Sequence, residues 1–291
     1  MNLEEQQYLN LVRDILEKGT MECGRNGNTI SLFGASMRFS LKEGKIPILT
    51  TKKVAWKTCL KELLWFIRGN TDNTLLQKQG VHIWDANGSR EFLNSRGLVE
   101  RKENDLGPIY GFQWRHFNAK YRGCSEKYHG KGIDQLEEII AALKDPETRT
   151  SRRLVMTTWN PCALHEMALP PCHILCQFNV HDGNKLSCCM YQRSSDEFLG
   201  SPFNIASYSF LTHLLAKHCG LEAHEFVYFI GNAHIYEQHI EAVKKQLQRE
   251  PYDFPTVEIT QQRENIDDYI VEDFVVSNYK SHEAIKGDLI V

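Results

Sequence analysis

Hydrophobic positions recur along this chain with two different periods, and the helical period is the clearer of the two. Residues 4–18 carry Tyr8, Val12 and Ile15 on one helical face. Gly19 follows this segment directly and acts as a stop signal. The pattern therefore predicts an amphipathic helix near the start of the sequence.

The same spacing predicts four further helices. Residues 55–68 form a strongly apolar one, and residues 133–144 form an amphipathic one. Another opens at Ser201-Pro202, which suit the N-cap and first helical positions, and runs to Gly220. The last runs from about residue 234 to residue 250.

Strand-like runs have a period of two or are continuously apolar. Residues 29–39 alternate around a glycine, and residues 154–159 read as a buried strand. Two runs, 172–180 and 185–193, flank Asp182-Gly183, which is the strongest short-range signal for a hairpin. A hairpin symmetric about that dipeptide places Cys172 opposite Arg193.

Helices and strands are mixed without regular βαβ alternation, and no glycine-rich phosphate loop is present. This order favours an α+β fold, with a mixed β-sheet packed against helices. No linker, repeat or low-complexity tract interrupts the chain, so we expect one domain over residues 1–291.

Composition narrows the classes of function. A net charge of -3 over 291 residues gives no general field for nucleic acid or membranes, and no apolar run reaches the length of a membrane span. The first residues are polar and acidic, which argues against a leader. The nine cysteines are scattered and include no CxxC pair, so we expect reduced thiols in the cytoplasm or nucleus, and no metal site.

Cys172 is the candidate nucleophile. In the predicted hairpin, directly paired residues share a face, so the Arg193 guanidinium lies beside the thiol. A nearby positive charge favours the thiolate, which is the nucleophilic form. The alternative is an inert cysteine in a buried strand next to a surface arginine.

Glu62 is the candidate acid or base, because it lies inside the most apolar helix. Desolvation there raises the pKa of a carboxyl group towards neutrality, which suits proton transfer. The alternative is a Glu62 that faces solvent or pairs with Lys57 or Lys61.

Other polar residues suit recognition of a nucleotide. Arg152 and Arg153 can each bind phosphate bidentately; the alternative is that they form a solvated charge run. Arg25 is a lone arginine in a turn. Asn204 can hydrogen-bond a base edge, or it caps a helix. His234 and Tyr236, at a predicted helix start, can bind hydroxyl groups or simply pack. Together these residues suggest an enzyme that acts on a nucleotide monophosphate.

Several segments in the right order resemble the thymidylate synthase family, from about residue 5 to the end of the chain. The matching segments are 62–66, 83–88, 105–115, 171–173, 192–196, 199–208 and 234–236. The resemblance implies a thymidylate synthase-like single domain whose sheet lies at a homodimer interface. It also implies reductive methylation of dUMP to dTMP with 5,10-methylenetetrahydrofolate as co-substrate, which leaves as dihydrofolate, through a covalent Cys172 adduct at uracil C6.

The resemblance also implies roles for individual residues. Glu62 moves protons at O4 and C5, and Asn204 reads the uracil edge. The implied contacts to dUMP are Arg25, Arg193, Ser194, Asp196, His234 and Tyr236, with Arg152 and Arg153 reaching across the dimer interface. Tyr110 and His173 form a supporting polar network. The implied contacts to the folate are Trp84, Asn87, Asp196, Leu199, Gly200, Phe203 and Val291, and Asp196 is also implied in catalysis.

The chain departs from the family's usual pattern at Gly24, Ala55 and Asn232 and in its C-terminal tail, changes that touch folate binding more than dUMP chemistry. They leave open a dUMP hydroxymethylase on the same scaffold, in which water completes the reaction, and a catalytically silent nucleotide-binding protein. A cysteine hydrolase using His173 as base is excluded, because adjacent strand residues point to opposite faces. The resemblance is to eukaryotic-type members, so the expected compartment is the cytoplasm, or the host cytoplasm for a viral protein.

Overall fold

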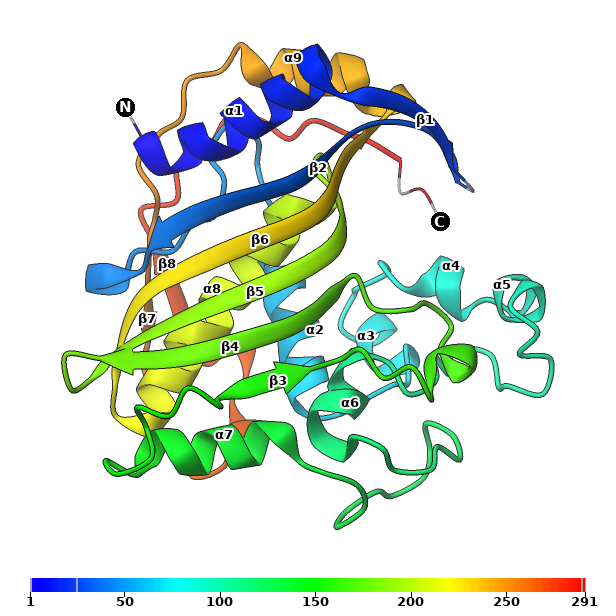
Figure 1. Cartoon of the computed structure of the whole chain (residues 1–291), viewed down its shortest axis with the longest axis vertical. Coiled ribbons are helices and arrows are strands. Elements are labelled where there is room, and N and C mark those ends of the chain that lie inside the picture. The colour runs from blue at the N-terminus through cyan, green and yellow to red at the C-terminus, as the bar shows by residue number, and fades with distance from the viewer. Residues whose placement is uncertain (1, 25, 289, 291) are drawn as a thin grey trace.

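A mixed β-sheet forms the centre of the computed structural model, which describes residues 2–24, 26–288 and 290 (Figure 1). Within these residues, six strands lie in the order β1-β2-β6-β5-β4-β3. Their bounds are Thr20–Gly24 for β1, Gly27–Ser40 for β2, Val155–Thr157 for β3, His173–His181 for β4, Lys185–Asp196 for β5 and Glu222–Tyr236 for β6. Among the described strands only β5 and β6 pair in parallel, so the predicted α+β fold with a mixed sheet is confirmed.

Helices cover one face of this sheet: Figure 1 shows α8 packed behind β5 and β6, and α2 packs against α8. The longest, α8, is buried on almost every side and ends at Gly220 in a left-handed conformation. The bounds are Leu3–Lys18 for α1, Trp56–Ile67 for α2, Thr74–Gln77 for α3, Asp85–Gly88 for α4, Arg90–Ser95 for α5, Tyr110–His116 for α6, Gln135–Lys144 for α7, Gly200–Cys219 for α8 and Ile240–Leu247 for α9. A small second sheet pairs β7 (Thr256–Ile259) with β8 (Phe274–Ser277).

The predicted helices over residues 4–18, 55–68 and 133–144 are confirmed within two residues at each end. The prediction that Ser201 caps the fourth helix is wrong, because α8 already begins at Gly200. The predicted last helix is also wrong at its start: residues 234–236 end the strand β6, and the helix α9 begins only at Ile240. Strand β6 lies between two partners, and its nearly continuous apolar run does not distinguish a central strand from a buried helix.

The hairpin is confirmed, but its register differs from the symmetric prediction. Residues 182–184 form a three-residue turn, so His181 pairs with Lys185 and Leu175 pairs with Tyr191. An irregularity between His173 and Leu175 shifts the register back by one residue. As a result, the Arg193 backbone N–H donates to the Cys172 carbonyl at 2.9 Å, and the predicted pairing of these two residues holds.

The face of the sheet away from α8 carries an exposed apolar row. Leu175, Tyr191 and Phe229 pair directly across β4, β5 and β6 and are 36%, 37% and 44% exposed. The prediction that residues 154–159 form a buried strand is wrong for the side chains on this face. Val155, in the edge strand β3, is 39% exposed. On the opposite face of the same strands, the side chains of Cys176, Met190 and Tyr228 are buried in the core.

Candidate active site

Cys172 lies just before β4, half-buried, with the Arg193 side chain fixed beside it. The guanidinium donates to the carbonyls of Pro171 at 2.8 Å and Pro170 at 3.2 Å. Its Nη2 lies 3.9 Å from the Cys172 Sγ. Burial raises the pKa of the Cys172 thiol, and the Arg193 charge lowers it only in part. The expected proximity is confirmed, and the Arg193 charge acts in the expected direction, but burial outweighs it.

Tyr110 and His173 form a rigid support on the other side of the cysteine. The Cys172 backbone N–H donates to the Tyr110 hydroxyl at 2.8 Å, and the rings of Tyr110 and His173 stack with centroids 4.2 Å apart. His173 Nδ1 lies 2.7 Å from the Tyr208 hydroxyl. Burial lowers the pKa of His173 to about 3, so its imidazole is neutral and does not act as a base at neutral pH.

Glu62 projects from α2 and accepts a hydrogen bond from Trp84 Nε1 at 2.7 Å. Desolvation raises the pKa of Glu62 to about 7, and the bond from Trp84 opposes this rise. Among the described residues Glu62 makes no ion pair, and the Lys61 ammonium instead donates to the Gln79 carbonyl. The predicted raised pKa is thus confirmed, and pairing with a neighbouring lysine is not observed.

Aromatic packing connects the carboxyl group to the cysteine. The Trp84 and Tyr110 rings meet edge to face with centroids 6.0 Å apart, and Tyr110 is the residue that holds the Cys172 backbone. Trp84 belongs to the turn that begins α4, where Asn87 is buried and its Nδ2 has no hydrogen-bond partner in the described structure. Two of the expected folate contacts therefore lie on the Glu62 side of this cluster.

The turn between β5 and α8 carries several of the predicted residues. Asp196 Oδ1 accepts from the backbone N–H of Phe198 at 2.9 Å and of Leu199 at 3.4 Å, which closes the turn ahead of Gly200. Asn204, in the first turns of α8, is half-buried. Within the described chain its amide makes no hydrogen bond, so both its donor and its acceptor are available to a ligand.

His234 and Tyr236 reach this turn from the end of β6, not from a helix start as predicted. Parallel pairing places His234 beside Asp196, and Ser194 beside Asn232. His234 Nδ1 lies 2.9 Å from Asn232 Oδ1, and burial lowers the pKa of the imidazole. The rings of His234 and Tyr236 are 5.2 Å apart.

Lys52 is a buried cation at this turn that the sequence reasoning missed. Its ammonium donates to the Phe198 carbonyl and lies 3.7 Å from the centroid of the Phe198 ring. Burial lowers the pKa of Lys52 to about 7, against the opposing charge of Asp196. In the sequence, Lys52-Lys53 resembles a surface charge run, and only its place directly before an apolar helix could have drawn attention to it.

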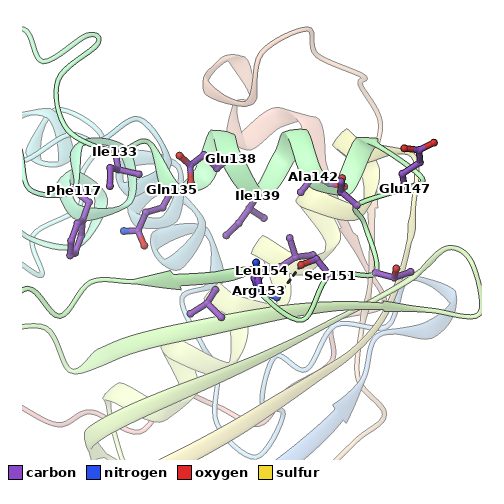
Figure 2. Close-up of a pocket in the computed structure, with 13 residues that line it drawn as sticks. Phe117, Ile133, Gln135, Glu138, Ile139, Ala142, Glu147, Ser151, Arg153 and Leu154 are labelled. Atoms are coloured by element: carbon purple, nitrogen blue, oxygen red, sulfur yellow. Dashed lines mark hydrogen bonds between the residues drawn. The ribbon is translucent and has the colours of Figure 1, made fainter.

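Arg25 and Val291 are outside the described residues, and two other predicted residues lie away from this cluster. Arg152 and Arg153 are exposed in the turn before β3. Arg153 lines a cavity of about 710 Å³ between α7 and residues 147–155 (Figure 2), and neither Cys172 nor Arg193 borders that cavity. Within one chain, the fold therefore does not direct Arg153 to the cysteine.

The described helices include none that is both long and apolar enough to cross a membrane.

Comparisons with known proteins agree with the geometry. A family model described as thymidylate synthase matches residues 6–291. The chain is 52% identical over 289 residues to the thymidylate synthase of Equine herpesvirus 2, covering 99% of this chain and 98% of the relative. It is 52% identical over 292 residues to the bifunctional dihydrofolate reductase-thymidylate synthase of Leishmania major, covering 100% of this chain. It is also 52% identical over 302 residues to the probable thymidylate synthase of Schizosaccharomyces pombe, again covering 100% of this chain. The chain spans 56% of the length of the Leishmania relative and 48% of the Schizosaccharomyces relative.

Proposed function

Because this chain belongs to the thymidylate synthase family, we propose that it methylates dUMP to dTMP with 5,10-methylenetetrahydrofolate as co-substrate, and that dihydrofolate is the second product. The observation that carries this proposal is the position of Cys172 between Arg193 and Tyr110, on the same aromatic cluster as Glu62. This arrangement supplies a nucleophile and a group that exchanges protons near neutral pH. The co-substrate, when bound, supplies a one-carbon unit and a hydride.

Cys172 carries the covalent step. Its sulfur adds to C6 of the uracil ring, and the electron pair of the C5–C6 bond moves towards C5 and O4. The thiol passes its proton to solvent in this step, and the Arg193 charge offsets part of the cost of forming a thiolate in a buried site. The carbon–sulfur bond breaks again when the product forms, which regenerates the free cysteine.

Glu62 exchanges protons with the ring. With its pKa raised to about 7, roughly half of the carboxyl groups are ionised at neutral pH, so Glu62 can both donate at O4 and accept the proton that leaves C5. Trp84 fixes one of its oxygens, and the other remains for an ordered water or the substrate. We assign Tyr110 and His173 to orienting the cysteine, since a His173 whose pKa is lowered to about 3 is too weak a base to take up a proton at neutral pH.

Recognition of dUMP follows from the polar groups around the cysteine. Asn204 reads the uracil edge, because an amide accepts from N3–H while it donates to O4, and cytosine reverses this pattern. Arg193, Ser194 and Arg25 bind the phosphate, and His234 and Tyr236 bind the ribose hydroxyl. Asp196 contributes to both substrates and to catalysis. The folate lies against Trp84, Asn87, Leu199, Gly200, Phe203 and Val291.

We also propose that the active form is a homodimer built on the exposed face of the sheet. The row of Leu175, Tyr191 and Phe229 is an apolar surface that a second copy of the chain can cover. Arg152 and Arg153 are exposed in the turn before the edge strand β3, and we assign them to the phosphate site of the other subunit. All nine cysteines are free thiols, which supports a reducing compartment such as the cytoplasm.

The test is to incubate the purified protein with dUMP and methylenetetrahydrofolate and to identify both products by mass spectrometry. We expect dTMP and dihydrofolate, and we expect Cys172→Ala to abolish them while dUMP still binds. Hydroxymethyl-dUMP with tetrahydrofolate would show that water, not hydride, completes the reaction. Binding of dUMP without turnover by the unaltered protein would favour the catalytically silent alternative.

A further inference from the structure

Glu197 is a buried acid that the proposed mechanism does not use. It lies in the turn between β5 and α8, directly after Asp196, and is 0% exposed. Its Oε2 accepts a hydrogen bond from the Ser201 hydroxyl at 2.6 Å. Its Oε1 has no hydrogen-bond partner among the described residues. A buried carboxyl group with one oxygen that lacks a partner is expensive in its charged form, so its position calls for an explanation.

The carboxyl group belongs to a network that connects three elements of the site. The hydroxyl groups of Ser195 in β5 and Ser201 in α8 lie 2.9 Å apart. Ser195 also lies 3.0 Å from the Tyr228 hydroxyl of β6, and Tyr228 donates to Gln192 Oε1 at 2.8 Å. Every member of this network is buried. Glu197 is therefore the acidic end of a chain of hydroxyl groups that fastens the start of α8 to the sheet.

The backbone of Glu197 is held as firmly as its side chain. Its N–H donates to the His234 carbonyl at 2.9 Å, and its carbonyl accepts from the Tyr8 hydroxyl at 2.6 Å. The next residues of the turn are fixed by Asp196 and by Lys52. The contacts of Glu197 thus fall in the middle of the segment that presents Asp196, Leu199 and Gly200 to the site.

The charges around Glu197 favour its neutral form. The titratable groups that face it are Asp196, which precedes it directly in the chain, Tyr8 of α1 and Tyr228 of β6, with Lys52 and His234 at the same turn. Asp196 repels a second negative charge, while the Lys52 ammonium donates to the Phe198 carbonyl instead of pairing with Glu197. Burial raises the pKa of Glu197 to about 8, and the Asp196 charge adds to this rise. At neutral pH the group is therefore mainly a carboxylic acid.

We propose that Glu197 is a positioning residue. As a neutral acid hydrogen-bonded to Ser201, it holds residues 196–200 in the geometry that receives the folate. When Glu197 ionises, these residues are no longer held in that geometry. This inference rests on the proposed function, because it concerns how the co-substrate is bound. Ionisation places two adjacent negative charges in the turn and leaves a charged oxygen without a partner. The expected effect is a loss of productive folate binding at alkaline pH, with little effect on binding of dUMP.

The experiment compares the unaltered protein with Glu197→Gln over a range of pH. Glutamine has the same shape and can still bond to Ser201, but it does not ionise. For the unaltered protein we expect kcat/KM for methylenetetrahydrofolate to fall about tenfold between about pH 7 and about pH 9 through this group alone. Ionisation of Glu62, Lys52 and Cys172 is common to both proteins, so it cancels in the ratio of their kcat/KM values. We expect that ratio to rise in favour of Glu197→Gln as the pH rises, while the KM for dUMP stays the same in both.

A second pair of variants keeps the test decisive if Glu197→Gln folds poorly. Ser201→Ala removes the hydrogen bond that lowers the pKa of Glu197, so the alkaline fall should move to higher pH. Ser209→Ala is the matched control: Ser209 is also a buried serine of α8, but its hydroxyl donates to the Ile205 carbonyl of its own helix, so the pH profile should not change. Circular dichroism at each pH establishes that every variant is folded.

Parallel pH profiles for the unaltered protein and Glu197→Gln, or equal shifts for Ser201→Ala and Ser209→Ala, would overturn this inference and leave the proposed function standing. An unaltered protein that does not turn over dUMP at any pH would overturn the proposed function and this inference with it.

Discussion

Replacing Trp84 with phenylalanine tests whether the ionisation of Glu62 limits the reaction. The Trp84 Nε1 lies 2.7 Å from Glu62 Oε1, and this bond is the one contact that lowers the pKa of the carboxyl group against desolvation. Phenylalanine keeps an aromatic ring in the cluster and removes the donor. We therefore expect the pKa of Glu62 to rise above its value of about 7.

The size of the effect follows from the strength of such a bond. A hydrogen bond to a charged group contributes about 1.5–3 kcal/mol, which corresponds to about 1–2 pKa units. At about pH 7, the ionised fraction of Glu62 then falls from roughly one half to between about one tenth and one hundredth. If the ionised form is the one that accepts the C5 proton, kcat falls about 5- to 50-fold at neutral pH and at most about 2-fold at about pH 9.

The assay is the pH dependence of kcat at saturating folate, because Trp84 is also an expected folate contact and its loss can raise KM. The control is the same substitution in a Glu62→Gln background, where no carboxyl group remains to titrate. There the Trp84→Phe effect should be independent of pH. A loss of kcat that is the same at every pH in the Glu62 protein would refute the reasoning, since it would show that Trp84 acts by packing alone.

Three further substitutions test two residues of the site and one packing contact of the fold. Arg193→Gln removes the charge that lowers the pKa of Cys172, so alkylation of this thiol by iodoacetamide near neutral pH should slow several-fold. If the alkylation rate depends on pH in the same way in both proteins, the expected effect of the Arg193 charge on the Cys172 pKa is contradicted. Asn204→Asp replaces the amide donor with an acceptor, and the ratio of kcat/KM for dUMP over dCMP should fall by at least about tenfold, whereas an unchanged ratio would argue against its role in reading the base. Gly111→Ala places a Cβ against a backbone carbonyl of α2 and should lower the free energy of unfolding, measured in urea, by at least about 2 kcal/mol. Gly200→Ala is the control for stability, because its Cβ meets nothing closer than 3.7 Å. Equal losses of stability in the two variants would refute the steric argument.

Local signals were sufficient for much of the fold. The helical period over residues 4–18 and 55–68 and the Asp182-Gly183 turn each depend on neighbouring residues in the chain, and all three elements are present. The pairing of Cys172 with Arg193 also holds, although the three-residue turn and the irregularity near His173 offset each other to produce it. A strand's register depends on its turn and on any bulge, and the sequence shows only the first of these.

The strand β6 shows where local reasoning failed. It pairs in parallel with β5 only after the whole of α8 has crossed behind the sheet, so no short-range signal announces it. Because this pairing brings His234 beside Asp196, the predicted helix start at His234 also misplaced part of the site.

By itself, the sequence determined the family, the four longest helices of the described residues, the hairpin and the identity of the candidate nucleophile and acid, because these depend on residue types and spacings within short segments. Only the tertiary structure decided which charges are buried together. Burial outweighs the Arg193 charge at Cys172, and it makes Lys52 and Glu197, which no sequence pattern singled out, into buried groups whose pKa values lie near neutrality. Desolvation depends on every element that packs around a group, and those elements come from distant parts of the chain.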